Sequence, residues 1–180
     1  MIKHEVKVLL SEQEVDKRIQ EIGDMITKDF AGETVHLVCV LMGGSFFMCE
    51  LAKRINLDVK IDFMSCSSYG KGTASSGHIK IIKDLEESIE GKNVIVVEDI
   101  IDSGRTLSHL LDLLKSRQPE SLALCALLDK PERRVVEVPV DYIGFRVPDY
   151  FVVGYGLDYD QKYTNLPYIG RVHIDDEVLK

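Results

Sequence analysis

Short apolar runs alternate with segments of helical periodicity along this chain of 180 residues. The runs at 35–41, 94–97 and 122–128 are almost entirely apolar, which is typical of strands buried on both faces of a parallel sheet. Residues 12–30, and a segment that begins near residue 106, place apolar side chains at helical spacing instead. The alternation predicts an α/β fold with a mostly parallel central sheet and helices on both faces.

Shorter elements complete this prediction. We expect strands at 59–65 and 78–83, a helix that Ser45 caps and that runs to residue 55, and a last short strand at 151–154. A chain of this length suits one domain and is too short for two ordinary ones.

Charge and composition exclude several classes of function. Lys and Arg number 22 and Asp and Glu number 30, so the net charge of −8 disfavours general nucleic-acid binding, which needs clustered cations. No apolar run approaches the ~20 residues of a membrane-spanning helix, and early charges argue against a secretory signal. The cysteines lack the spacing of zinc ligands, and we expect them to be buried thiols of a cytoplasmic protein: Cys39, Cys49, Cys66 and Cys125.

The residues after Val97 carry the strongest chemical signal, because ligands of open α/β sheets bind at the carboxyl ends of the strands. Glu98 and Asp99 are adjacent carboxylates, and like charges so close raise each other's pKa unless a cation compensates. Residues 102–106 form a turn of mostly small residues before a helix, which directs backbone N–H groups and the helix dipole at a phosphate. On these residues alone, an acidic surface turn before a capped helix remains an alternative.

Other nucleotide-binding motifs fit poorly. The P-loop pattern G-x-x-x-x-G-K-[ST] is absent, and Gly91-Lys92 precedes a predicted strand instead of following one. The G-x-G-x-x-G pattern of dinucleotide-binding folds is also absent after the first strand.

Residues 94–107 (VIVVEDIIDSGRTL) resemble the signature of the type I phosphoribosyltransferases and match the hypoxanthine/guanine branch of that family closely. Further segments match the family in the expected order: 41–44, 67–70, 127–130 and 151–159. The resemblance implies the family's fold over residues 1–180, with a small hood formed by the N- and C-terminal segments. It also implies a flexible lid loop at about residues 66–78.

The resemblance further implies a reaction of purine salvage. Hypoxanthine or guanine and 5-phosphoribosyl diphosphate would give IMP or GMP and diphosphate, with Mg²⁺ as cofactor. Glu98 and Asp99 would bind the ribose hydroxyls of the donor, partly through metal-bound water, and together with Asp158 they would hold the metal. Asp102 would carry the proton of purine N7, a role that suits a partly desolvated carboxylate.

The same resemblance assigns the phosphates of the donor to two loops. Met42 and Gly43 match the diphosphate loop, in which the peptide bond after Leu41 is often cis in the family. The backbone and hydroxyls of the following turn match the 5′-phosphate site: Ser103, Gly104, Arg105 and Thr106. Ser68 and Tyr69 match the lid, whose closure would exclude water. On composition alone, the glycine turn and the lid segment also fit plain surface loops.

The resemblance assigns the base to residues that follow the later strands. Lys130 matches the lysine that donates to purine O6, although a lysine just past a strand is usually solvated. Phe151 would stack on the base, and Val152 would contact the edge of the base through its backbone. Asp158 would serve the 2-position of the base through its backbone as well as metal-bound water through its carboxylate.

One position departs from the family pattern. Relatives carry an arginine that contacts diphosphate where this chain has Thr164. Thr164 supplies no cation, so either diphosphate binds more weakly or Arg171 or Lys162 substitutes for it.

Two other functions stay open. A regulator that uses this fold to sense the donor and bind RNA or DNA would need a basic surface, which the net charge of −8 disfavours. A sibling enzyme acting on xanthine or another nucleobase would share most of these residues. As partners we expect the base, the donor and further copies of the chain in a homodimer or homotetramer, with no nucleic acid and no membrane.

Overall fold

A computed structural model describes residues 5–68 and 79–173 of the chain. Its main feature is a six-stranded sheet in the order β4-β3-β2-β5-β6-β7, in which only β4 runs antiparallel to its neighbour. The strands of this sheet are β2 (Thr34–Val40), β3 (Asp58–Ser68), β4 (Ile79–Lys83), β5 (Asn93–Ile101), β6 (Ser121–Asp129) and β7 (Tyr142–Arg146). The mostly parallel sheet predicted from the alternating pattern is thus confirmed.

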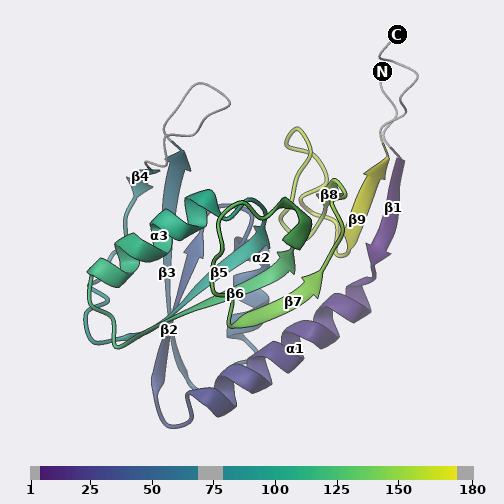
Figure 1. Ribbon diagram of the computed structural model, residues 1–180. Coiled ribbons are helices and arrows are strands. Elements are labelled where there is room, and N and C mark those ends of the chain that lie inside the picture. Colours follow the sequence, from purple (N-terminus) through teal and green to yellow (C-terminus); the bar gives the residue numbers. More distant parts are fainter. Residues whose placement is uncertain (1–4, 69–78, 174–180) are drawn as a thin grey trace.

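Helices cover both faces of this sheet (Figure 1). Two of them, α1 (Glu12–Asp29) and α2 (Ser45–Ala52), pack on one face, and α3 (Arg105–Ser116) packs on the other. Side chains of β5 alternate between the two cores: Ile95 and Val97 pack with α1 and α2, whereas Val94 and Val96 pack with α3. Because both faces of β5 are buried over residues 94–97, this part of its sequence is a continuous apolar run.

A second, three-stranded sheet has the order β1-β9-β8, and all its pairings are antiparallel. It joins β1 (Glu5–Leu10) near one end of the chain to β9 (Ile169–His173) near the other, and β8 (Val152–Val153) completes it (Figure 1). The expectation that the strand near 151–154 is the last one is therefore wrong, because β9 follows it. Sequence patterning did not predict β1, β7 or β9, since their partly exposed residues interrupt the apolar runs.

Several boundaries differ from the predictions. Strand β5 continues to Ile101 because it pairs with β6 as far as Ile101 opposite Asp129, so Glu98 and Asp99 lie within the strand. Ser45 is not the N-cap of α2: Gly44 holds that position without a side-chain hydrogen bond, and the Ser45 hydroxyl donates to the Met42 carbonyl at 2.6 Å. This helix also ends at Ala52, before the predicted residue 55.

Within the described ranges, no helix is long and apolar enough to cross a membrane.

Candidate active site

Three of the predicted segments, the loop after β2, the acidic motif of β5 and Lys130 after β6, meet at the carboxyl ends of these strands. Cys39 of β2 lies opposite Val97 of β5, which places the loop after β2 beside Glu98 and Asp99. The backbone N–H of Lys130, just past β6, donates to the Ile101 carbonyl at 3.0 Å. The three segments singled out in the sequence therefore form one continuous edge of the sheet, as expected for ligand sites of open α/β folds.

The loop after β2 packs tightly on the acidic pair. A Cβ added to Gly43 would lie 1.6 Å from Oδ2 of Asp99, and one added to Gly44 would lie 3.1 Å from the Val97 carbonyl. Only glycine at position 43 leaves room for the Asp99 carboxylate in this arrangement. The Leu41–Met42 peptide bond is cis, and the Met42 side chain is exposed.

Burial governs the charge of the acidic pair. Desolvation and the neighbouring Asp99 hold the pKa of Glu98 well above its ordinary value. Burial is also the main cause that raises the pKa of Asp99, opposed by its hydrogen bond from the Ile100 N–H at 2.7 Å and reinforced by the charge of Asp158. This electrostatic influence is consistent with the predicted grouping of the three carboxylates.

The oxygen-rich composition of this edge suits a hard cation such as Mg²⁺. In the part of the chain that the structure describes, no group of three His, Cys, Asp or Glu side chains is close enough to enclose a metal. Mg²⁺ is commonly held by one or two carboxylates together with substrate phosphates, so two buried carboxylates without an enclosing third fit that mode of binding.

The phosphate-binding candidate, residues 103–106, is fixed by a neighbouring segment. Gly104 precedes α3 with a φ of 79°, and a Cβ there would lie 2.2 Å from the Val136 carbonyl, so this position requires glycine. The backbone N–H groups of Val135 and Val136 both donate to the Ser103 carbonyl, at 2.9 and 3.0 Å. The turn therefore leads into the N-terminus of a 12-residue helix, and hydrogen bonds from the neighbouring segment anchor the backbone of the turn.

The environment of Asp102 combines exposure with an ion pair. Its side chain is 48% exposed, so the carboxylate is only half covered, and its predicted role stays a prediction. The carboxylate forms an ion pair with Arg133, whose Nε lies 2.7 Å from Oδ1 of Asp102. Arg133 ends the short 3₁₀ helix η1 (Pro131–Arg133) that follows β6.

Lys130 is buried, with 9% of its side chain exposed. Its Nζ lies 3.7 Å from Oδ1 of Asp149, which therefore balances the buried charge. Phe151 is half-exposed, and its ring meets that of Tyr159 edge-on with centroids 4.9 Å apart. An exposed aromatic face held by a second ring is a suitable platform for a purine.

The remaining predicted residues lie in or after β8. Val152 is buried in β8 opposite Arg171. Asp158 is exposed, and its Oδ2 accepts a hydrogen bond from the Gln161 N–H at 2.8 Å. The Thr164 carbonyl accepts from the Gly156 N–H at 2.9 Å.

Neither possible substitute for the family arginine is without a partner. The Arg171 guanidinium lies 3.7 Å from the centroid of the Tyr150 ring. Lys162 lies 3.9 Å from the carboxylate of Asp160, and both of these side chains are largely exposed. A cation from Lys162 would therefore need to exchange only a weak surface pair.

The lid lies mainly outside the described residues. Ser68 is the last residue of β3, and Tyr69 falls in the range 69–78 that the structure does not describe. Their predicted roles stay predictions.

Arg133 and Asp149 were not predicted from the sequence. The run Lys130-Pro131-Glu132-Arg133-Arg134 contains the only available signal, a cluster of cations just after a buried strand. Its meaning depends on Asp102 and Asp149, which are distant in sequence.

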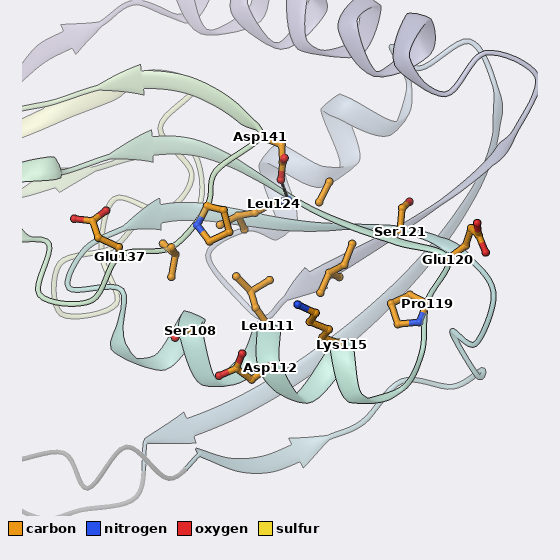
Figure 2. Close-up of a pocket in the computed structure, with 14 residues that line it drawn as sticks. Ser108, Leu111, Asp112, Lys115, Pro119, Glu120, Ser121, Leu124, Glu137 and Asp141 are labelled. Carbon is orange, nitrogen blue, oxygen red and sulfur yellow. Dashed lines mark hydrogen bonds between the residues drawn. The ribbon is translucent and has the colours of Figure 1, made fainter.

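A cavity outside the predicted site lies elsewhere in the fold (Figure 2). Its volume is about 450 Å³, and it lies between α3, β6 and the segment that ends at Asp141. It contains none of the predicted site residues. A smaller cavity of about 160 Å³ is the one lined by Glu98, Asp102 and the 103–106 turn.

Comparisons with known proteins agree with this geometry. The sequence profile of the phosphoribosyl transferase domain matches residues 5–160. The hypoxanthine phosphoribosyltransferase of Escherichia coli strain K12 is 51% identical over 178 residues, covering 98% of this chain and all of the relative.

Solved structures are similar over nearly the whole chain. A hypoxanthine phosphoribosyltransferase from Staphylococcus aureus has a TM-score of 0.90 and 47% identity, covering 93% of this chain and 91% of that one. A hypoxanthine-guanine phosphoribosyltransferase from Bacillus anthracis has a TM-score of 0.89 and 45% identity, covering 95% and 99%.

Proposed function

This chain belongs to the phosphoribosyltransferase family, and we propose that it serves purine salvage by transferring a 5-phosphoribosyl group to hypoxanthine and guanine. The donor is 5-phosphoribosyl diphosphate, and the products are IMP or GMP and diphosphate. The observation that carries this proposal is a buried lysine, Lys130, just after the end of β6, the strand next to the acidic motif. A lysine kept dry at this position is suited to select an oxygen of the base.

The donor binds along the sheet edge formed by the loop after β2 and the 103–106 turn. Residues 42 and 43 hold its diphosphate, and the 103–106 turn holds its 5′-phosphate through backbone N–H groups, hydroxyls and the end of α3. Glu98 and Asp99 lie beside the ribose. Positive charge develops on the ribose ring in the oxocarbenium-like transition state, and fixed carboxylates favour that charge.

Mg²⁺ fits this site, with Glu98, Asp99 and Asp158 as the residues that hold it directly or through water. When bound, the ion would keep the desolvated carboxylates ionised and offset the negative charge of the diphosphate.

Asp102 moves a proton of the base. As purine N9 forms its bond to ribose C1′, the diphosphate departs with the electron pair of the broken C–O bond. The proton on N7 passes to the Asp102 carboxylate, which is paired with the Arg133 guanidinium.

Lys130 selects the base. Its ammonium group is a donor without acceptor capacity, so it matches O6 of hypoxanthine or guanine and opposes the amino group of adenine. Phe151 stacks on the ring, the backbone of Val152 contacts its edge, and Asp158 serves the 2-position. Ser68 and Tyr69 belong to the lid, and the β1-β9-β8 sheet corresponds to the hood of a single domain.

The protein is cytoplasmic in this proposal, because all four of its cysteines are free thiols, as in a reducing compartment. Cys49 is exposed, which corrects the expectation that every thiol is buried. We propose that the chain forms a homodimer or homotetramer and binds neither nucleic acid nor membrane.

A panel of bases tests the function. With 5-phosphoribosyl diphosphate and Mg²⁺, hypoxanthine and guanine should both give nucleotides, with kcat/KM values within about a hundredfold of each other. Adenine should be poorer by roughly 10⁴–10⁵, because two donors would meet in the dry pocket. Xanthine as the preferred base would indicate the sibling activity, and donor binding without turnover of any base would indicate a regulator.

A further inference from the structure

A chain of ion pairs connects the two residues that would touch the same edge of the purine. Nζ of Lys130 lies 3.7 Å from Oδ1 of Asp149, and Nη1 of Arg133 donates to the same oxygen at 3.3 Å. Nε of Arg133 then lies 2.7 Å from Oδ1 of Asp102. The order Lys130–Asp149–Arg133–Asp102 alternates two cations with two anions.

Backbone hydrogen bonds fix the points from which these side chains extend. Asp102, Lys130 and Asp149 follow the neighbouring strands β5, β6 and β7. The Val147 N–H donates to the Asp129 carbonyl at 2.9 Å, which ties the segment after β7 to the end of β6.

The 3₁₀ helix places the fourth member. The Arg133 N–H donates to the Lys130 carbonyl at 3.1 Å, so Arg133 is tied by its backbone to the lysine whose partner it shares. Secondary structure thus sets the spacing of the four charged residues, and their side chains span the remaining distances.

The purine presents O6 and N7 on the same edge, close together in space. A lysine that reads O6 and a carboxylate that exchanges the N7 proton must therefore be held at a matching separation. Each is long or exposed enough to move: the Asp102 side chain is 48% exposed, and a lysine has four rotatable stem bonds.

The guanidinium of Arg133 is suited to hold this separation. It is planar and presents donors in fixed directions, here to two different carboxylates through Nε and Nη1. Asp149 is suited to hold Lys130, because a buried ammonium without a counter-charge is costly.

We propose that Asp149 and Arg133 are positioning residues that set the Lys130 ammonium and the Asp102 carboxylate in register with O6 and N7 of one base. This inference rests on the proposed roles of Lys130 and Asp102. It predicts that Asp149 acts mainly on recognition of the base, and Arg133 mainly on the rate of transfer.

Separate measurement of kcat and of KM for each substrate tests this division. Asp149→Asn should raise KM for hypoxanthine about tenfold and reduce discrimination against adenine, while KM for the donor stays within about twofold. Arg133→Met should lower kcat about tenfold with hypoxanthine, again with little change in KM for the donor. Arg133→Lys keeps the charge but lacks the fork, so it should recover only part of the loss.

The double variant Asp149→Asn/Arg133→Met measures the energetic coupling between Asp149 and Arg133. Because both residues act through one chain, their combined loss in kcat/KM should be smaller than the product of the single losses. Glu132→Gln, an exposed neighbour on the same 3₁₀ helix, is the matched control and should resemble the wild type. Thermal unfolding of every variant identifies any general loss of structure. If Arg133→Met has lost structure, Arg133→Lys and Asp149→Asn are compared alone.

The inference is overturned if the losses multiply as independent effects, or if KM for the donor and KM for the base rise together. Lys130→Met and Asp102→Asn separate it from the proposed function. If those two variants retain wild-type turnover and base selection, the proposed roles themselves are wrong. If they lose them while Asp149→Asn and Arg133→Met do not, only the positioning roles are wrong.

Discussion

The donor side of the site and its base side lie on the same sheet edge but are built in different ways. On the donor side, residues 41–44 and 98–106, backbone and carboxylates pack so closely that Gly43 and Gly104 have no room for a Cβ. On the base side, residues 130–133 and 149–158, the groups that would contact the base are placed by side-chain ion pairs and include a half-exposed aromatic ring.

This difference follows from what each side has to hold. Phosphates and ribose are the same in every turnover, so their contacts can be made by backbone groups that the fold fixes permanently. Bases differ by single groups, and in the proposed function side-chain charges such as Lys130 would discriminate between them without any change of backbone. Substitutions on the donor side should therefore affect all bases alike, whereas substitution of Lys130 or Asp149 on the base side should change the choice among them.

Removal of divalent metal should have the largest effect. Glu98 and Asp99 are desolvated and would face the negative diphosphate, so excess chelator should reduce nucleotide formation to background with every base. Formation of IMP is measured before and after chelation, and restoring Mg²⁺ in excess is the control. Undiminished turnover in chelator would show that the donor side works without a cation.

Asp102→Asn should have the next largest effect, because Asp102 is the donor-side residue that would accept the proton of the base and pairs with Arg133 of the base side. Loss of the proton acceptor should lower kcat by ~10²–10⁴ for hypoxanthine and guanine alike, while KM for the donor changes little. Asp112→Asn on α3, which lines the remote cavity of Figure 2, is the matched control and should have wild-type kinetics. Unchanged turnover of the Asp102 variant would remove this residue from the mechanism.

Gly43→Ala tests the close packing of the donor side. The new Cβ would displace the Asp99 carboxylate, and a misplacement of about 1 Å can cost about a hundredfold in rate. We expect a loss of that size in kcat/KM for the donor, with the ratio between hypoxanthine and guanine unchanged. Gly91→Asn, at a position with open space around it, should leave activity intact. A change in base preference in the Gly43 variant would contradict the separation of the two sides.

Thr164→Arg should have the smallest effect. Thr164 belongs to the loop that follows the base side, but the added cation should assist the donor side. KM for the donor, or for diphosphate in the reverse reaction, should fall a few-fold, because an exposed ion pair contributes only about 0–1 kcal/mol. Two unchanged constants would indicate that another cation, such as Lys162, already meets the diphosphate.

The sequence alone determined the central architecture and identified the residues proposed to bind the donor. Apolar runs identify β2, β5 and β6 because the central residues of these strands are buried on both faces, where polar side chains are disfavoured. The acidic pair and the 102–106 turn are contiguous, so their chemistry can be recognised within a dozen residues.

Only the tertiary structure decided the hood-like sheet and the polar connections of the base side. Strand β1 pairs with β9, which lies more than 150 residues away in the sequence. Exposed positions in β1 interrupt the apolar pattern from which a strand is predicted. The burial of Lys130, the exposure of Asp102 and their connection through Asp149 and Arg133 depend on three strand ends and a 3₁₀ helix meeting. Burial and charge pairing are properties of neighbours in space, and for these residues the neighbours are distant in sequence.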